Sequence, residues 1–232
     1  MAVLDPDEVV WVLSVAPAFD TSLVAKADII IPLACLVGAP LCDKDPVGAK
    51  NINYDAIEFI LSIKKDTQLL VFPNTNSGYG VGKDSEFCTE ESPLNPISLY
   101  GKLKVAIEEK ILEANGISLR LATVFGVSPR PRLDLLVNDF TFRAVRDRFI
   151  VLFESHFKRN YIHVNDVSRA FLHCIKHFDT MKGQAYNIGL SDANLSKKEL
   201  CLEIRKHVDK FEIIESDYAK DIDKRNYIVS NE

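Results

Sequence analysis

Apolar and polar positions follow two different patterns along this chain. Short continuous apolar runs, typical of buried strands, alternate with stretches in which apolar residues recur every three or four positions, as they do in amphipathic helices. The strand-like runs are residues 9–14, 28–34, 68–73 and 117–126, and the helical stretches are residues 46–64, 99–115 and 133–148. Buried strands separated by helices predict a parallel sheet covered on both faces, which is a doubly wound α/β fold.

Beyond about residue 128 the pattern becomes less regular. Shorter strands are predicted at residues 149–153, 184–189 and 211–214, with helices at residues 166–178 and 196–208. Gly116 is expected to end the helix before the strand at residue 117. We therefore expect two domains, residues 1–127 and a smaller lobe of residues 128–232 that is interwoven with the first.

The stretch FPNTNSGYGVG at residues 72–82 has three glycines at alternate positions, as a phosphate-binding loop could have. A phosphate loop opens directly into a helix, whereas Gly82 is followed by a charged segment with two prolines. We interpret the glycines as a turn. The first glycine of the chain is Gly38, so the glycine-rich turn that normally opens a dinucleotide-binding sheet is absent from the early sequence.

Composition and charge limit the classes of partner that the protein is expected to bind. The 232 residues are 47% hydrophobic and 26% charged, which suits a soluble globular protein, and the net charge of -5 argues against a general binder of nucleic acid or anionic membranes. The five cysteines are scattered and predict reduced, buried thiols without a metal site. The early apolar run follows acidic residues, unlike a signal peptide, so we expect a cytoplasmic protein.

Tyr100 and Lys104 lie four residues apart at the start of a predicted helix, so that both side chains emerge from one face. A tyrosine is a poor base at neutral pH, because its pKa must fall by about 3 units, and a neighbouring ammonium supplies part of that shift. Taken alone, such a pair is more typical of an exposed helix surface than of a catalytic site. The surrounding sequence decides between the two interpretations.

The strand QLLVFPNT ends in Thr75, three residues precede Tyr79 and Gly80, and the Tyr100 and Lys104 pair follows. This arrangement resembles the NAD-dependent nucleotide-sugar epimerase/dehydratase family of extended short-chain dehydrogenases/reductases. The segments ADIIIPLACLVG, NINYDAIEFI, SLRLATVFG, KRNYIHVNDVSRAF, QAYNIGLSD and DKRNYIVSNE are similar to family segments in the same order. Two positions depart from the family pattern, Pro32 where a histidine is common and Thr123 where an asparagine is frequent.

The resemblance implies roles for particular residues. Residues 1–127 would be a partial NAD-binding Rossmann-like domain and residues 128–232 the substrate-binding lobe. The catalytic residues would be Thr75, Tyr100 and Lys104, and NAD would contact Ala34, Leu36, Asn51, Tyr100 and Lys104. Asn51 would also be the family's structural asparagine on the cofactor side. A nucleotide-diphosphate sugar would contact Thr123, Asn138, Arg159 and Arg225, the two arginines binding the diphosphate. Outside these sets, we expect His163 to be a core or hinge residue and Asp166 to cap the following helix.

The implied activity is that of a nucleotide-sugar epimerase, which oxidises a sugar carbon to a ketone and reduces it again. A 4,6-dehydratase or a keto-sugar reductase is the alternative, but dehydratases carry an acidic residue just after the Ser/Thr, where this chain has Asn76 and Ser77. Members of the family often dimerise through two helices, so a homodimer is expected. The chain looks truncated at both ends, which also allows a non-catalytic protein that binds sugar nucleotides or a partner, and it predicts weak NAD binding by these 232 residues.

Overall fold

The computed structural model describes residues 21–82, 86–129, 131–218 and 225–232, and the predicted strand at residues 9–14 lies outside them. The chain forms two compact units, each assembled from three segments. The first unit comprises Met1–Gly78, Leu94–Arg120 and Arg169–Tyr186. The second comprises Tyr79–Pro93, Leu121–Ser168 and Asn187–Glu232. The units divide at these positions and not at residue 127.

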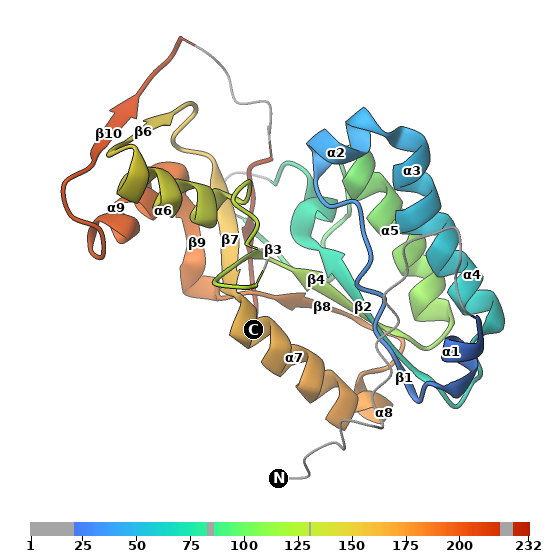
Figure 1. The fold of residues 1–232 in the computed structure, drawn as a ribbon. Coiled ribbons are helices and arrows are strands. Elements are labelled where there is room, and N and C mark those ends of the chain that lie inside the picture. The colour runs from blue at the N-terminus through green and yellow to red at the C-terminus, as the bar shows by residue number, and fades with distance from the viewer. Residues whose placement is uncertain (1–20, 83–85, 130, 219–224) are drawn as a thin grey trace. The chain divides into compact units, whose positions relative to one another are not determined.

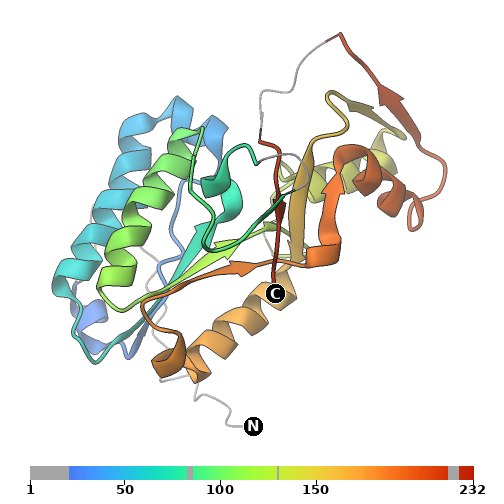
Figure 2. The ribbon, with the colours of Figure 1, turned by 180° about the vertical axis from the view of Figure 1, so that it is seen from behind.

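A four-stranded sheet in the order β1-β2-β4-β8 is the framework of the first unit (Figure 1). Strand β1 pairs parallel with β2, with Ile29 opposite Leu69. Figures 1 and 2 show α4 and α5 on one face of this sheet and α8 on the other. The elements that lie wholly or partly in this unit are α1 (Thr21–Lys26), β1 (Ile29–Ile30), α2 (Ala39–Lys44), α3 (Pro46–Lys50), α4 (Ala56–Ile63), β2 (Leu69–Thr75), α5 (Leu99–Glu113), β4 (Ile117–Leu121), α7 (Val164–Lys176), α8 (Phe178–Met181) and β8 (Ala185–Ile188). The predicted α/β class is confirmed.

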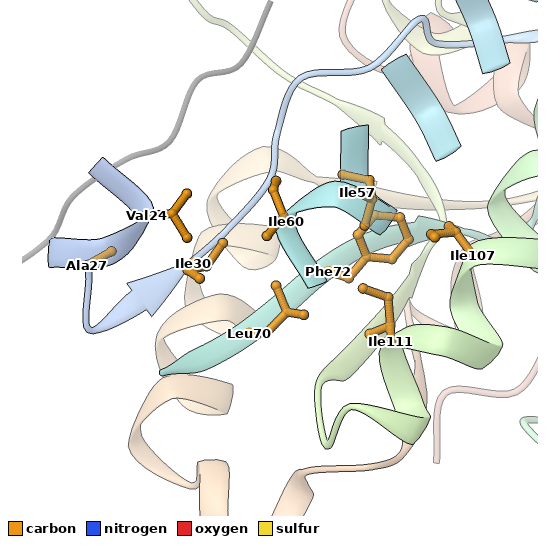
Figure 3. Packing of buried hydrophobic residues seen from close by; sticks show 9 residues of the cluster. All are labelled: Val24, Ala27, Ile30, Ile57, Ile60, Leu70, Phe72, Ile107 and Ile111. Atoms are coloured by element: carbon orange, nitrogen blue, oxygen red, sulfur yellow. The ribbon is translucent and has the colours of Figure 1, made fainter. Parts of the chain in front are cut away.

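The core of the first unit lies between β2 and the helices on one face of the sheet. Figure 3 shows its members, which are Val24, Ala27, Ile30, Ile57, Ile60, Leu70, Phe72, Ile107 and Ile111. The Phe72 ring of β2 lies beside Ile107 and Ile111 of α5, and both isoleucines are fully buried. Burying a side chain of this size stabilises the fold by roughly 1.5–3 kcal/mol. This packing holds α5 against β2, next to the end of the strand that carries Thr75.

Both ends of α5 are fixed by local hydrogen bonds. Ser98 is the N-cap, and its side chain accepts a hydrogen bond of 3.1 Å from the Gly101 N–H. At the other end the Gly116 N–H donates to the Ile111 carbonyl (2.8 Å), while Asn115 adopts the left-handed conformation with φ +57°. The predicted helix stop is therefore confirmed, but Asn115 and not Gly116 is the left-handed residue.

The predicted helix over residues 46–64 is interrupted. A π-helical turn, Asn51–Asp55, separates α3 from α4. Such turns are rare, and they are frequent at functional sites. The predicted strand at residues 28–34 is also shorter than expected, because pairing ends at Ile30. Pro32 follows and has no N–H to donate to a ladder.

The second unit contains a three-stranded sheet in the order β5-β7-β9 and two short pairs, β10-β6 and β11-β3. Helices α6 and α9 pack with the β6 and β7 strands around buried residues that include Phe140, Leu152 and Tyr161. Its elements are β3 (Phe87–Cys88), β5 (Thr123–Phe125), α6 (Leu136–Arg146), β6 (Phe149–Leu152), β7 (Lys158–His163), β9 (Asn194–Ser196), α9 (Lys197–Arg205), β10 (Glu212–Glu215) and β11 (Ile228–Val229).

Two predictions about strands are corrected in this part of the chain. The single strand predicted at residues 117–126 is two strands, β4 and β5, which belong to different sheets and are separated by Ala122. The central strand β7 was not predicted, because its first three residues, Lys158–Asn160, are polar and give no apolar pattern. Arg159 and Asn160 are nevertheless buried there.

Candidate active site

The end of β2 turns sharply at the position predicted for the catalytic threonine. Thr75 is the last residue of β2, and a 3-10 turn, Asn76–Tyr79, follows it. The Thr75 hydroxyl donates to Ser77 Oγ (3.0 Å) and accepts a hydrogen bond from the Ser77 N–H (3.1 Å). Gly80 then takes φ +69°, a conformation that favours glycine. The glycine-rich stretch is thus a turn, as predicted.

Helix α5 presents Tyr100 and Lys104 beside this strand end. Both side chains are buried, and Lys104 Nζ donates to the Pro73 carbonyl of β2 over 2.7 Å while lying 4.2 Å from the centre of the Phe72 ring. A Cβ added at Gly101 would lie 3.1 Å from the Ser77 carbonyl, so the first turn of α5 closely approaches the turn after Thr75. The structure therefore brings the three predicted catalytic residues to one edge of the first unit.

The environment of Lys104 lowers the pKa of its ammonium. Burial disfavours the charged ammonium and lowers the pKa of Lys104 below its usual value, and a hydrogen bond to the Cys35 side chain partly opposes this shift. Cys35 precedes Leu36 in the loop after β1, and both residues are partly exposed. The lysine is therefore held between the end of β2 and the loop that the sequence assigned to the cofactor.

That loop is held by an asparagine, although not by the predicted one. Asn53 is buried, its Oδ1 accepts a hydrogen bond from the Leu36 N–H, and its Nδ2 donates to the Leu36 carbonyl, both at 2.9 Å. Asn51 is exposed at the start of the π-helical turn. The structural part of the role predicted for Asn51 therefore belongs to Asn53. Cofactor contacts of Ala34, Leu36 and Asn51 stay predictions.

Asn53 could have been found from its spacing. It precedes Ile57 by four residues and Ile60 by seven, and all three side chains are buried, so the asparagine continues the buried face of α4. The burial of Glu108 could have been predicted from its spacing in the same way. It follows Lys104 by four residues and Tyr100 by eight, and it is buried on the same helix. A charged residue in register with a catalytic pair is a signal that the sequence contains.

The residue after Thr75 has an unsatisfied side chain. Asn76 is 1% exposed, and neither Oδ1 nor Nδ2 has a hydrogen-bond partner. Leaving a buried amide unpaired costs about 1–3 kcal/mol for each lost partner, so such groups in native proteins call for an explanation. The unpaired amide therefore lies inside the protein, directly after Thr75.

In the second unit the two predicted diphosphate arginines lie on neighbouring segments. Arg159 is on β7, and its guanidinium lies 5.6 Å from the centre of the Tyr227 ring. The adjoining residues connect the two segments, because the Lys158 N–H donates to Asn226 Oδ1 over 2.9 Å. Arg159 is buried and Arg225 partly exposed. The structure thus brings together two arginines that are far apart in the sequence.

The other two predicted substrate residues have structural surroundings of their own. Thr123 begins β5 and pairs with Tyr161 of β7. Asn138 accepts a hydrogen bond from the Gly126 N–H (3.3 Å) and donates to the Arg132 carbonyl (3.0 Å), so it holds the segment that leads into α6. Contact of either residue with a sugar stays a prediction.

His163 and Asp166 lie where β7 passes into α7. His163 Nδ1 accepts a hydrogen bond of 3.2 Å from the Asn165 N–H, which satisfies a donor in the first turn of α7. Asp166 lies within the first turn, where a negative charge interacts favourably with the helix dipole. His163 therefore accepts one capping hydrogen bond at the start of α7, and the roles expected for His163 and Asp166 stay predictions.

Three further features bear on the class of site. Among the described residues, no group of three His, Cys, Asp or Glu side chains is arranged to hold a metal ion. Within the same part of the chain, no helix is both long and apolar enough to cross a bilayer. All five cysteines are free thiols, and four are buried. Burial raises the pKa of Cys42 and Cys174 to about 11 and that of Cys201 to about 12.

Residues 16–189 match the model of the NAD dependent epimerase/dehydratase family. The chain therefore belongs to this family. A curated relative, the UDP-glucose 4-epimerase of Lactobacillus helveticus, is 27% identical over 200 residues. The match covers 73% of this chain and 60% of that relative, so the chain spans about three fifths of its length.

Solved structures with the same fold include two sugar-nucleotide enzymes. The UDP-glucose 4-epimerase of Thermotoga maritima, solved with UDP-glucose, has a TM-score of 0.76 at 20% identity, and the match covers 91% of this chain and 73% of that one. The dTDP-glucose 4,6-dehydratase of Bacillus anthracis, solved with NAD, has a TM-score of 0.72 at 21% identity, with 88% and 64% covered. At these identities the likeness establishes the fold alone.

Proposed function

We propose that the natural protein is a nucleotide-sugar epimerase that acts through transient oxidation of the sugar to a ketone. Membership of the NAD dependent epimerase/dehydratase family supports the class of reaction. The observation that carries the proposal is the arrangement of β2 and α5, in which Thr75 ends the strand and Tyr100 and Lys104 lie buried on the adjoining helix. These groups supply a hydroxyl, a phenol and an ammonium at one edge.

Each of the three residues has a definite task in this proposal. Tyr100 accepts the proton of the sugar hydroxyl during oxidation and returns it during reduction. Lys104 favours the phenolate through its charge, and its hydrogen bond to the Pro73 carbonyl holds the ammonium in place. Thr75, whose hydroxyl oxygen accepts a hydrogen bond from the Ser77 N–H, would turn its single hydrogen from Ser77 Oγ to the reacting oxygen of the sugar.

NAD, when bound, supplies the hydride acceptor and later the hydride donor for this chemistry. Lys104 and Tyr100 would hold its nicotinamide ribose, and the loop with Ala34 and Leu36 would lie against it. The hydrogen bonds from Asn53 to Leu36 support this assignment, because they fix the loop backbone in place.

The proposed substrate is a nucleotide-diphosphate sugar. Arg159 and Arg225 supply guanidinium groups from adjoining segments of the second unit, and a planar guanidinium suits bidentate recognition of a diphosphate. Thr123 and Asn138 are the proposed contacts to the sugar. Relatives that act on UDP-glucose support this class of substrate.

Epimerisation is favoured over elimination of water by the two residues that follow Thr75. Elimination needs an additional acid and base, and neither the Asn76 amide nor the Ser77 hydroxyl can serve as one near neutral pH. Ser77 is moreover engaged with Thr75. A ketone formed at this edge is therefore expected to be reduced again without loss of water.

The test is incubation of the full natural protein with NAD and either UDP-glucose or dTDP-glucose, followed by NMR of the sugar. Inversion of one carbinol centre with no net change in NAD supports the epimerase. A 4-keto-6-deoxy sugar would identify a dehydratase. Stoichiometric consumption of reduced cofactor with an added keto-sugar would identify a reductase. Binding of either sugar nucleotide without turnover would identify a non-catalytic binding protein.

A further inference from the structure

A buried polar network connects α5 to the end of β2. At its centre is the carboxylate of Glu108, whose side chain is 4% exposed. Asn74 Nδ2 and Ser118 Oγ each donate to Glu108 Oε2 over 2.6 Å. The Arg120 guanidinium donates to Oε1 over 2.7 Å through one terminal nitrogen and to both oxygens, at 3.1 and 3.2 Å, through Nε. One helix and two strands thus meet at a single carboxylate.

The stability of the protein alone does not explain this network. A buried ion pair such as that of Arg120 and Glu108 gains little net free energy, because removing both charges from water offsets their attraction. Apolar residues of similar volume are often equally good at such positions. What a carboxylate provides and an apolar group lacks is direction, since it requires its donors to lie at particular places.

Asn74 connects the Glu108 carboxylate to the backbone of Thr75 by hydrogen bonds. Its Nδ2 also approaches Ser118 Oγ (3.2 Å), and its Oδ1 accepts a hydrogen bond of 2.9 Å from the Thr75 N–H. The amide can adopt only this orientation, because a flip would place its oxygen against the Glu108 carboxylate and its NH2 group against the Thr75 N–H. Both ends of the Asn74 side chain are therefore fixed.

Glu108 is also rigidly connected to the proposed base. It follows Lys104 and Tyr100 at intervals of four residues on α5, so the three side chains lie on one face of the helix, and eight residues of helix span about 12 Å. The hydrogen bond from Lys104 Nζ to Pro73 joins the same two elements one turn earlier. The helix thus has two polar attachments to β2, one of which leads directly to Thr75.

We propose that Glu108 is a positioning residue that acts through Asn74 to fix Thr75 relative to α5. The network sets the position of the Thr75 backbone, and Ser77 then sets the direction of its hydroxyl. This inference rests on the proposed function, because it assigns a purpose to the placement of Thr75. Misplacing a catalytic group by about 1 Å can lower a rate by roughly a hundredfold, so a network that prevents such a shift has a measurable effect on catalysis.

The first experiment is a double-mutant cycle in the full natural protein with Asn74→Ala, Thr75→Ala and the double variant. We expect Asn74→Ala to lower kcat by about tenfold or more, with KM changed much less, because the misplaced group acts in the chemical step. The double variant should be no slower than Thr75→Ala, because the proposal has Asn74 act on catalysis through Thr75. Fully additive losses would overturn the proposal.

Ser118→Ala is the matched control. It removes a donor to the same Glu108 oxygen, at the same 2.6 Å, but Ser118 has no hydrogen bond to Thr75. Both single variants should lower the melting temperature, whereas the loss of kcat should be distinctly larger for Asn74→Ala. Equal losses of kcat in the two variants would mean that the network serves stability alone.

A reciprocal exchange tests Glu108 itself. Asn74→Asp places a second carboxylate against Glu108 and should abolish turnover or folding, whereas Asn74→Asp combined with Glu108→Gln restores one carboxylate and one amide at the contact. We expect the double variant to recover most of the lost kcat. A folded double variant no faster than Asn74→Asp would contradict the proposed role of Glu108.

Hydrogen exchange of the Thr75 amide separates this proposal from the proposed function. If the wild-type protein turns over neither UDP-glucose nor dTDP-glucose, the proposed function fails, and exchange then decides about positioning without any need for activity. The Thr75 amide should exchange faster in Asn74→Ala and stay protected in Ser118→Ala. Unchanged protection in Asn74→Ala would overturn the positioning role even in an active enzyme.

Discussion

The proposed catalytic edge of the first unit and the pair of arginines in the second are built in different ways. Thr75, Tyr100 and Lys104 come from one strand end and one helix, and hydrogen bonds within the same unit hold two of them in place. Arg159 and Arg225 come from segments far apart in the sequence that adjoin through Lys158 and Asn226. Local spacing determines the pairing of Tyr100 with Lys104, and the packing of α5 against β2 adds Thr75 to it. The two arginines come from adjoining segments through folding alone.

The first prediction concerns binding of NAD and has the largest expected effect, because the dialysed chain should retain no NAD at all. The 232-residue chain has no glycine before Gly38, and a pyrophosphate needs N–H groups at a helix N-terminus with glycine for close approach. Two hydrogen bonds from Tyr100 and Lys104 contribute only about 0.5–1.5 kcal/mol each. We expect no NAD to remain after extensive dialysis of this chain, as measured by absorbance of the denatured supernatant.

Titration with fresh NAD by calorimetry is the control for loss during purification. Tightly bound NAD in the dialysed chain would contradict the prediction and would direct attention to the turn with Gly78, Gly80 and Gly82. That turn would then be a phosphate site after all.

The second prediction tests the base. Tyr100→Phe in the full natural protein should lower turnover by about a hundredfold or more, because a general base contributes that much. The fold should be unchanged, since only a hydroxyl is lost. Tyr218→Phe is the matched control, because Tyr218 is 98% exposed. Retention of more than about a tenth of wild-type kcat would remove Tyr100 from the mechanism.

Sequence reasoning succeeded where the information was local. The doubly wound class followed from alternating apolar runs and amphipathic stretches, and the pairing of Tyr100 with Lys104 followed from a four-residue spacing. The helix end near Gly116 was also predicted, although the left-handed residue is Asn115. These features depend on neighbours within one or two helical turns.

The sequence did not predict strands whose polar residues are buried, or the division of one strand-like run between two sheets. β7 begins with Lys158, Arg159 and Asn160, and the last two are buried through interactions with distant segments that no periodicity reveals. The run at residues 117–126 contains no proline and no glycine before Gly126, so no turn signal in it marks the change of sheet at Ala122. Asn53, and not Asn51, is buried although both lie in one π-helical turn, because Asn53 shares the buried face of Ile57 and Ile60.

The third prediction concerns the arginines. Replacing Arg159 or Arg225 with alanine should weaken binding of UDP-glucose by at least about tenfold, because a charge-assisted bidentate contact is stronger than a neutral one. Isothermal titration of the full natural protein measures the change. Arg146→Ala is the control for net charge, since Arg146 lies on α6 of the same unit and pairs with Asp147. Unchanged affinity in both arginine variants would exclude the diphosphate assignment.

The last prediction concerns the stability of the first unit and has the smallest expected effect. Burial lowers the pKa of Lys104 below its usual value near 10.5, whereas the unfolded chain keeps the usual value. Between these two pKa values the unfolded state binds more protons than the folded state, so the free energy of unfolding should rise with pH in that window. The contribution of one proton is at most about 1.4 kcal/mol per pH unit.

Lys104→Met removes the titrating group and should remove this part of the rise, whatever its effect on stability at neutral pH. Urea denaturation of wild type and variant at a series of pH values approaching 10.5 measures it, and groups common to both proteins cancel in the difference. Lys102→Met is the control, because Lys102 is exposed on the same helix. Parallel curves for wild type and Lys104→Met would show that Lys104 titrates alike in the folded and unfolded chain. The ammonium would then be solvated, and the buried contact with Pro73 would not describe the protein in solution.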